Sequence, residues 1–241
     1  MNTSKELNLL NQKIVYDFTK FTATDYTNEL SCVVWFCSCN LRCAYCYNDN
    51  IVKSKQGEYS SNDILKFLSS RIGLLSAVVL SGGEALMYNL VPFCKEIKKM
   101  GFKIKLDTNA TYPKRLKELI SLNLIDFVSI DFKAPKSKYK LVTKKDSYEK
   151  TIESIKYLID INFPFELRTT VNTNLLNEND INEIIETIYC IGYNNIYYIQ
   201  NFLQTKSNLG NITQNRDLNR DLIKKDILKI EFRNTICVKV D

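Results

Sequence analysis

Residues 32–46 read Cys32-Val33-Val34-Trp35-Phe36-Cys37-Ser38-Cys39-Asn40-Leu41-Arg42-Cys43-Ala44-Tyr45-Cys46. The stretch opens with an apolar run of strand length and continues into a loop with three cysteines at C-x3-C-x2-C spacing, Cys39, Cys43 and Cys46. Thiolates so spaced reach one side of a cubic iron–sulfur cluster and leave its fourth iron without a protein ligand. The sequence therefore predicts a strand followed by a metal-binding loop whose cluster is open to a further ligand.

Apolar runs of strand length recur along the chain and alternate with amphipathic helical segments. The runs lie at residues 32–36, 77–80, 102–106, 126–130, 165–171 and 196–200. The clearest helical segment is 178–190, in which isoleucines repeat at the spacing of one helix face: Ile181, Ile184, Ile185 and Ile188. Strand and helix thus alternate about six times, which favours parallel strands joined by right-handed crossovers.

The length of the chain limits how many strand–helix units a barrel could contain. An eight-unit barrel typically needs about 250 residues, whereas this chain has 241 and an N-terminal extension, 1–30, before the first expected strand. We therefore expect an α/β fold, an open partial (β/α)6 barrel, in a single domain over 1–241. The C-terminal segment 206–241 is of uncertain structure, with a mobile loop expected at 206–220. The cysteine loop follows a strand end, where such barrels build their sites.

The composition of the chain argues against several classes of partner and of catalytic site. The net charge of +6 is spread along the chain and does not indicate a nucleic-acid partner. Residues 1–13 lack the features of a signal peptide, and no apolar stretch approaches the ~20 residues needed to span a bilayer, so we expect a cytoplasmic protein without a membrane partner. Histidine is absent, which excludes Ser-His and Cys-His nucleophile pairs.

The cysteines point to a metal. Eight are present, and five of them fall within residues 32–46. Structural zinc takes four ligands, so Cys32 or Cys37 would have to complete a zinc site. We favour an iron–sulfur cluster, with zinc and inert thiols as alternatives, and interpret Cys32 and Cys37 as core or near-cluster thiols. The remaining cysteines, Cys94, Cys190 and Cys237, are isolated, so one cluster is predicted.

The loop resembles that of the radical S-adenosylmethionine (SAM) enzymes, C-x3-C-x-aromatic-C, matched by Cys39, Cys43, Tyr45 and Cys46. The resemblance implies a single radical SAM domain in which a 4Fe-4S cluster binds SAM at its open iron. One electron from the cluster then cleaves SAM to a 5′-deoxyadenosyl radical. No catalytic residue is implied beyond the cluster ligands, because the cofactors carry the bond breaking.

A glycine turn with a carboxylate, Ser81-Gly82-Gly83-Glu84, follows the strand run 77–80. It resembles the superfamily's GGE motif, which implies that these residues hold the SAM ammonium group. Glycines suit this task because they let backbone carbonyls approach a ligand closely. Taken alone, the segment is better explained as an ordinary strand-to-helix turn with Glu84 in the first helical turn. Beside the cysteine loop, we favour the GGE motif instead.

Polar residues end three later strands. They are Asp107, Thr108, Asn109, Asp131, Lys133, Arg168 and Thr170. Two carboxylates at adjacent strand ends repel each other unless a cation lies between them. Taken alone, however, such residues are better explained as solvated strand ends or helix caps. The segments resemble the DTNG and D-x-K motifs of glycyl-radical-enzyme activating proteins. That likeness implies a possible monovalent cation site at Asp107, Thr108 and Asp131, with Lys133, Arg168 and Thr170 lining the SAM pocket.

Over residues 15–205 the chain is most similar to anaerobic ribonucleoside-triphosphate reductase activating proteins. The family implies a partner reductase whose glycyl radical loop enters the barrel, and reduced flavodoxin or ferredoxin as electron donor. Four positions depart from its pattern: Ser38 and Ala110 replace glycines, Tyr47 a histidine and Ala85 a proline. If position 110 needs a left-handed backbone, alanine there costs about 1 to 2 kcal/mol.

Two other functions stay open. One is a small radical SAM enzyme that acts on a metabolite or peptide, similar to the 7-carboxy-7-deazaguanine synthases. The other is a non-enzymatic zinc or iron–sulfur scaffold, which would not bind SAM.

Overall fold

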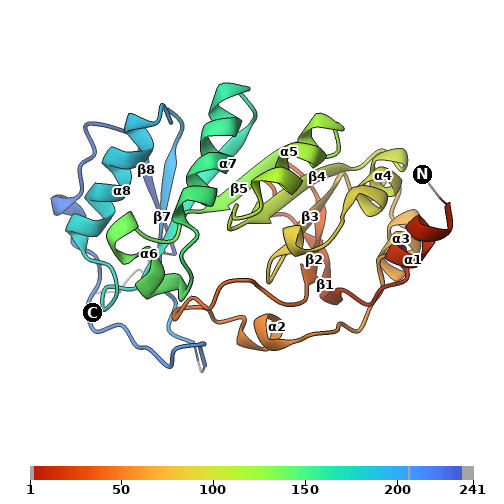
Figure 1. Cartoon of the computed structure of the whole chain (residues 1–241), viewed down its shortest axis with the longest axis horizontal. Coiled ribbons are helices and arrows are strands. Elements are labelled where there is room, and N and C mark those ends of the chain that lie inside the picture. Colours follow the sequence, from red (N-terminus) through yellow and green to blue (C-terminus); the bar gives the residue numbers. More distant parts are fainter. Residues whose placement is uncertain (1–2, 206, 235–241) are drawn as a thin grey trace. The chain divides into compact units, whose positions relative to one another are not determined.

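The structure is a computed structural model that describes residues 3–205 and 207–234 (Figure 1). Cys237 lies outside the described residues. The chain forms two compact units. The first comprises Met1–Asn40 and Asn48–Ser129, and the second comprises Leu41–Tyr47 and Ile130–Asp241. The chain thus passes from the first unit into the second and back within the cysteine loop.

The first unit is built on four strands that neighbour one another in chain order. They are β1 (Val15–Thr22), β2 (Ser31–Phe36), β3 (Ala77–Gly82) and β4 (Lys103–Thr108). β1 is antiparallel to β2, whereas β2, β3 and β4 are parallel, with Ser31 opposite Ala77 and Ala77 opposite Lys103. The first four residues of both β2 and β3 are buried, as expected for parallel strands covered on both faces.

Helices precede, connect and follow these strands. They are α1 (Thr3–Leu10), α2 (Asp49–Lys53), α3 (Ser61–Ser69), the short 3-10 helix η1 (Ala85–Met87), α4 (Val91–Lys99) and α5 (Pro113–Ser121). α3 begins with a capping box, in which the Ser60 side chain accepts from the Asp63 N–H and the Asp63 side chain accepts from the Ser60 N–H. Ile64 and Leu68 of α3, and Cys94 and Ile97 of α4, are fully buried.

β5 (Phe127–Asp131) begins in the first unit and ends in the second. The second unit continues with parallel strands β6 (Phe165–Val171), β7 (Tyr197–Asn201) and β8 (Ile230–Arg233). Its helices are α6 (Lys136–Thr143), α7 (Tyr148–Asp160), α8 (Glu178–Cys190) and the 3-10 helix η2 (Arg220–Leu222). The α8 bounds confirm the predicted helix 178–190, and its four patterned isoleucines are fully buried.

The α/β class is confirmed, because strands and helices alternate along the chain and parallel strands neighbour one another in chain order within each unit. All six expected strands are present. Two more were not predicted, β1 within residues 1–30 and β8 within 206–241. Both lack a buried apolar run: only Val15 is buried in β1, and no residue of β8 is. No helix in the described part of the chain is long and apolar enough to cross a membrane.

Candidate functional site

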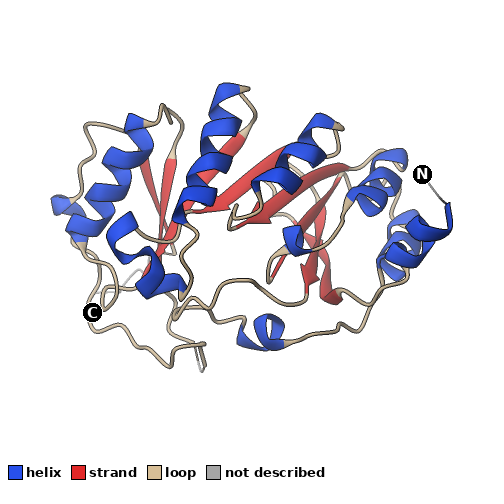
Figure 2. Cartoon of the chain, viewed as in Figure 1, coloured by secondary structure: helices blue, strands red, loops and turns tan. Residues whose placement is uncertain are grey.

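The loop between β2 and α2, which contains the three cysteines, has no regular secondary structure (tan in Figure 2). The chain enters this loop from β2 through a left-handed residue, Ser38. Ser38 has φ 59°, and its N–H donates to the Ile51 carbonyl at 2.9 Å. Its hydroxyl donates to the Ser54 carbonyl. A left-handed backbone favours glycine, and the serine hydroxyl bond offsets part of the conformational cost of having serine at position 38.

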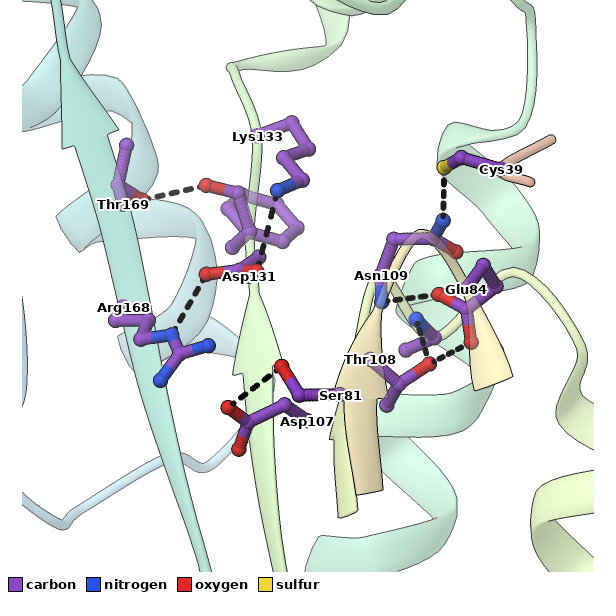
Figure 3. A network of polar contacts seen from close by, with 12 residues as sticks. Cys39, Ser81, Glu84, Asp107, Thr108, Asn109, Asp131, Lys133, Arg168 and Thr169 are labelled. Carbon is purple, nitrogen blue, oxygen red and sulfur yellow. Dashed lines mark hydrogen bonds and ion pairs between the residues drawn. The ribbon is translucent and has the colours of Figure 1, made fainter. Parts of the chain in front are cut away.

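The first cysteine lies beside the segment that follows β4. The Asn109 side-chain amide donates to the Cys39 sulfur at 3.8 Å and to the Asn40 side-chain oxygen at 2.9 Å (Figure 3). Asn40 in turn donates to the Thr111 hydroxyl at 2.7 Å. Asn109, one of the polar residues predicted at a strand end, is therefore a neighbour of a predicted cluster ligand.

The two glycines of the GGE segment lie against the end of β2. A Cβ on Gly83 would fall 1.6 Å from the Ser38 carbonyl oxygen, and one on Gly82 would fall 2.3 Å from the Phe36 nitrogen. The Gly83 N–H donates to the Phe36 carbonyl and the Glu84 N–H to the Ser38 carbonyl, both at 2.8 Å. Close backbone packing therefore requires both glycines, and it ties the GGE turn to the residue that precedes Cys39.

Glu84 is buried and caps η1 instead of lying in the first turn of an α-helix. One carboxylate oxygen accepts from the Thr108 hydroxyl at 2.7 Å, and the other accepts from the Asn109 N–H at 2.8 Å (Figure 3). The first oxygen also accepts from the Leu86 N–H at 3.1 Å. The predicted GGE and Asp-Thr-Asn segments are thus joined through this carboxylate.

Asp107 lies at the end of β4 with a cation beside it. Lys105 approaches one of its oxygens at 3.1 Å, and the Ser81 hydroxyl donates to the other at 3.3 Å. Lys105 is buried and also donates to the Asp25 carbonyl at 2.6 Å. Sequence reasoning did not single out Lys105. The sequence does contain a sign that Lys105 has a special role, because it places a charged residue between Ile104 and Leu106 in an otherwise apolar strand.

Ala110 has φ 58° and is buried, which confirms that this position adopts the left-handed conformation. Its N–H donates to the Thr108 hydroxyl at 2.9 Å.

In the second unit, Asp131 lies between two cations. The Arg168 Nε donates to one carboxylate oxygen at 2.7 Å, and Lys133 lies 3.2 Å from the other (Figure 3). Burial alone would raise the pKa of Asp131, but the adjacent Arg168 and Lys133 outweigh burial and hold that pKa well below its usual range. Asp131 therefore stays ionised, and its charge is balanced by side chains of its own unit.

Arg168 is also part of a wider set of charged contacts in the second unit. Glu166 lies 3.9 Å from Arg168 and accepts two hydrogen bonds from Arg233 of β8, at 3.2 and 2.9 Å. Thr170 is half-buried like Arg168 and shares its face of β6, because alternate side chains of a strand point the same way.

Cys43 and Tyr45 of the cysteine loop are buried, and Lys133 lies 5.9 Å from the centre of the Tyr45 ring. Burial raises the pKa of the Cys43 thiol to about 11, with the positive charge of Lys133 opposing the shift. Among residues 3–205 and 207–234, no three His, Cys, Asp or Glu side chains are gathered to hold a single metal ion.

The thiols outside the motif differ in exposure. Cys32 and Cys37 are fully buried, and burial raises the pKa of Cys32 to about 12. Cys94 is also buried, whereas Cys190 is exposed. The burial of Cys32 and Cys37 agrees with their interpretation as core thiols.

Sequence reasoning also missed the backbone contacts of the cysteine loop with residues 209 and 210. The Leu209 N–H donates to the Cys46 carbonyl and the Gly210 N–H to the Ala44 carbonyl, both at 2.8 Å. No local pattern in this polar stretch signals a contact with a loop so distant along the chain.

Comparison with known proteins supports the motifs. The model of the Radical SAM superfamily matches residues 33–189. The chain is 33% identical over 200 residues to the "Putative glycyl-radical enzyme activating enzyme MJ1227" of Methanocaldococcus jannaschii, covering 78% of this chain and 80% of that protein. It is 28% identical over 173 residues to a "Probable GTP 3',8-cyclase" of Saccharolobus islandicus, covering 67% of this chain but only 53% of the cyclase.

Solved structures share the fold. Streptococcus suis SuiB bound to S-adenosylmethionine aligns with TM-score 0.63 and 15% identity, over 81% of this chain and 48% of that chain. QueE from Escherichia coli aligns with TM-score 0.54 and 16% identity, over 83% and 89%. At these identities the likeness concerns the fold alone, and it confirms the predicted open partial barrel of the radical SAM type.

Proposed function

Because this chain belongs to the radical SAM superfamily and is a radical SAM enzyme, we propose that it is an activase that makes a glycyl radical on an anaerobic ribonucleoside-triphosphate reductase. The observation that carries the proposal is the likeness to a glycyl-radical enzyme activating enzyme over about four fifths of both chains. The cyclase likeness covers only about half of the cyclase.

In this proposal Cys39, Cys43 and Cys46 hold a 4Fe-4S cluster. Three soft thiols on one short loop fit such a cluster, and no histidine is available to form a different ligand set. When bound, the cluster supplies the electron that cleaves SAM. The overall products would be methionine, 5′-deoxyadenosine that carries the glycine hydrogen, and a glycyl radical on the partner.

The other motif residues bind and orient SAM. Ser81, Gly82, Gly83 and Glu84 would hold its ammonium group, while Asp107, Thr108, Asn109, Asp131, Lys133, Arg168, Thr170 and Tyr45 would line the site. Glu84 contributes by bracing the ends of β3 and β4, since its carboxylate accepts from Thr108 and Asn109. Asp131 contributes a fixed negative charge that Arg168 and Lys133 keep ionised.

A monovalent cation stays a prediction. Asp107 already has Lys105 beside it, and Asp131 has Arg168 and Lys133. A bound cation would therefore add to a charge balance that the side chains already provide.

The proposed partners follow from the activase function. They are the glycyl radical loop of the reductase and reduced flavodoxin or ferredoxin as electron donor. The proposed setting is the cytoplasm, without nucleic acid or membrane.

The test uses anaerobically reconstituted protein and a reductase whose glycine carries deuterium at the α-carbon. We expect deuterium in 5′-deoxyadenosine and a glycyl radical signal by electron paramagnetic resonance. Cys43→Ala is the control that should abolish SAM cleavage. Cleavage of SAM without deuterium transfer would reject the activase and favour an enzyme that acts on a metabolite or peptide.

A further inference from the structure

The part of the cysteine loop in the second unit is hydrogen-bonded through its backbone on two sides. At the end of α6, the Thr143 carbonyl accepts from the Arg42 N–H at 2.9 Å and the Val142 carbonyl accepts from the Ala44 N–H at 3.3 Å. On the other side, the Gly210 N–H donates to the Ala44 carbonyl. Ala44, between two predicted cluster ligands, is thus held by both its N–H and its carbonyl.

The second contact comes from a short turn, residues 208–212, that we name the clip. The buried Asn208 closes it: its side-chain amide donates to the Ile212 carbonyl and its side-chain oxygen accepts from the Ile212 N–H, both at 2.8 Å. The Asn211 N–H donates to the Asn208 carbonyl at 3.1 Å, and Asn211 has φ 49°. The clip therefore has a defined shape within a stretch that the sequence predicted to be a mobile loop.

The residue that follows the clip, Thr213, attaches it to the loop after β6. The Thr213 carbonyl accepts from the side-chain amides of Asn172, at 3.1 Å, and Asn174, at 2.9 Å. Asn172 is fully buried. The clip therefore links the end of β6, the strand that carries Arg168 and Thr170, to the cysteine loop.

Only glycine fits at position 210. A Cβ there would lie 2.8 Å from the Ala44 Cβ and 2.9 Å from the Ala44 oxygen. These contacts are closer than real Cβ atoms make, so any side chain at 210 has to displace the clip or the cysteine loop. This glycine is required by the contact with Ala44 and not by a left-handed backbone.

We infer that the clip is a positioning element for the cluster: by holding the carbonyls of Ala44 and Cys46, it keeps the intervening chain, and with it the Cys43 and Cys46 thiols, in one arrangement. The clip lies beyond residues 33–189, so the superfamily match does not include it. The inference rests on cluster binding in the proposed function, and it is independent of the reductase as target.

The test compares Gly210→Ala with wild type and with Gly192→Ala. Gly192 is also in the second unit, and a Cβ there would make an ordinary contact, 3.6 Å from Ile159, at φ 95°. The control therefore adds the same methyl group away from the cysteine loop. Asn208→Ala is a second variant, which opens the clip without adding volume.

The readouts are iron and sulfide per chain, the rate of iron release to a chelator, and the paramagnetic resonance spectrum of the reduced cluster with and without SAM. Groups that orient metal ligands typically change metal affinity by about 10- to 100-fold. We expect Gly210→Ala and Asn208→Ala to release iron at least about tenfold faster than Gly192→Ala and to broaden the spectrum. Thermal unfolding of the cluster-free proteins checks that all three variants fold.

Equal release rates and unchanged spectra in Gly210→Ala and Asn208→Ala would overturn the inference. If Gly210→Ala does not fold, the Asn208→Ala result decides. None of these readouts uses the reductase. If the activase proposal is wrong, deuterium transfer will be absent, but the iron-release rates and spectra of the clip variants will not be affected.

Discussion

The Asn109 side-chain amide donates to the Cys39 sulfur, and the Asn109 backbone N–H donates to Glu84. One residue thereby contacts a predicted cluster ligand and the carboxylate of the GGE turn. Cys39 of the cysteine loop and the segments proposed to bind SAM in the first unit are consequently joined by hydrogen bonds, and a change in one should be detectable in the other.

Removing the Asn109 amide should lower the cluster's reduction potential. A donor to sulfur stabilises the more negative, reduced cluster. We expect Asn109→Ala to lose about 1 kcal/mol of this preference, or roughly 40 mV for one electron. Potentiometric titration followed by paramagnetic resonance measures the potential. Asn62→Ala, which removes an exposed amide bonded to Asn11, is the control and should leave it unchanged. An unshifted potential in Asn109→Ala would contradict this role of the amide.

A methyl group at position 83 should destabilise the cluster-free protein, because it would overlap the Ser38 carbonyl oxygen. We expect Gly83→Ala to lower the free energy of unfolding by about 3 kcal/mol, at the upper end of overpacking effects. At Gly101, with φ 88° and nothing near its missing Cβ, the same substitution should cost only about 1 kcal/mol. Urea titration measures both. If the two variants lose the same free energy of unfolding, the protein can accommodate a methyl group at position 83 by a small shift, and the prediction is wrong.

Glycine at position 110 should stabilise the protein. Ala110 has a left-handed backbone, so Ala110→Gly relieves about 1 kcal/mol of strain in the folded state. The gain in the free energy of unfolding is smaller than this, because glycine also increases the entropy of the unfolded chain. Ser38→Gly should be nearly neutral, because it also removes the hydroxyl bond to Ser54. Thermal and urea unfolding measure the two variants side by side. A loss of stability in Ala110→Gly would rule out backbone strain as the dominant effect there.

Acid should weaken the attachment of the loop that contains the clip. Arg216 donates to both oxygens of Glu178 at the start of α8, at 2.6 and 2.9 Å. Its side-chain hydrogen bonds lower the pKa of Glu178 from 4.5 to about 2. The stability from this ionised carboxylate is present above pH 4.5 and is lost as pH falls toward 2, because the unfolded chain takes up the proton first.

Glu178→Gln should therefore be less stable than wild type at pH 7, and the difference should shrink between pH 4.5 and pH 2. Urea titrations at several pH values measure it. The control is Glu186→Gln, which removes a pair with Lys224 whose side chains are about half exposed, and it should have little effect at any pH. A stability difference between Glu178→Gln and wild type that does not change with pH would exclude this linkage.

The six core strands and helix 178–190 were predictable from the sequence because a buried element carries its pattern in its own residues. Four isoleucines on one face specify α8 without reference to any other segment. The cysteine loop was recognisable for the same reason, since its three motif cysteines lie within eight residues. β1 and β8 were missed because exposed strands bury few apolar side chains, and pairing with a neighbour decides them instead.

Three features could be recognised in the sequence alone because they are local patterns: the spacing of the three cysteines in the loop, the alternation of strand and helix, and the polar residues at strand ends. Only the tertiary structure decided that Gly83 must be glycine because of Ser38, that Lys105 balances Asp107, and that Gly210 contacts Ala44. Such contacts join residues whose separation along the chain carries no periodic signal. They form because folding brings particular backbone and charged groups within bonding distance, and that proximity is a property of the packed chain.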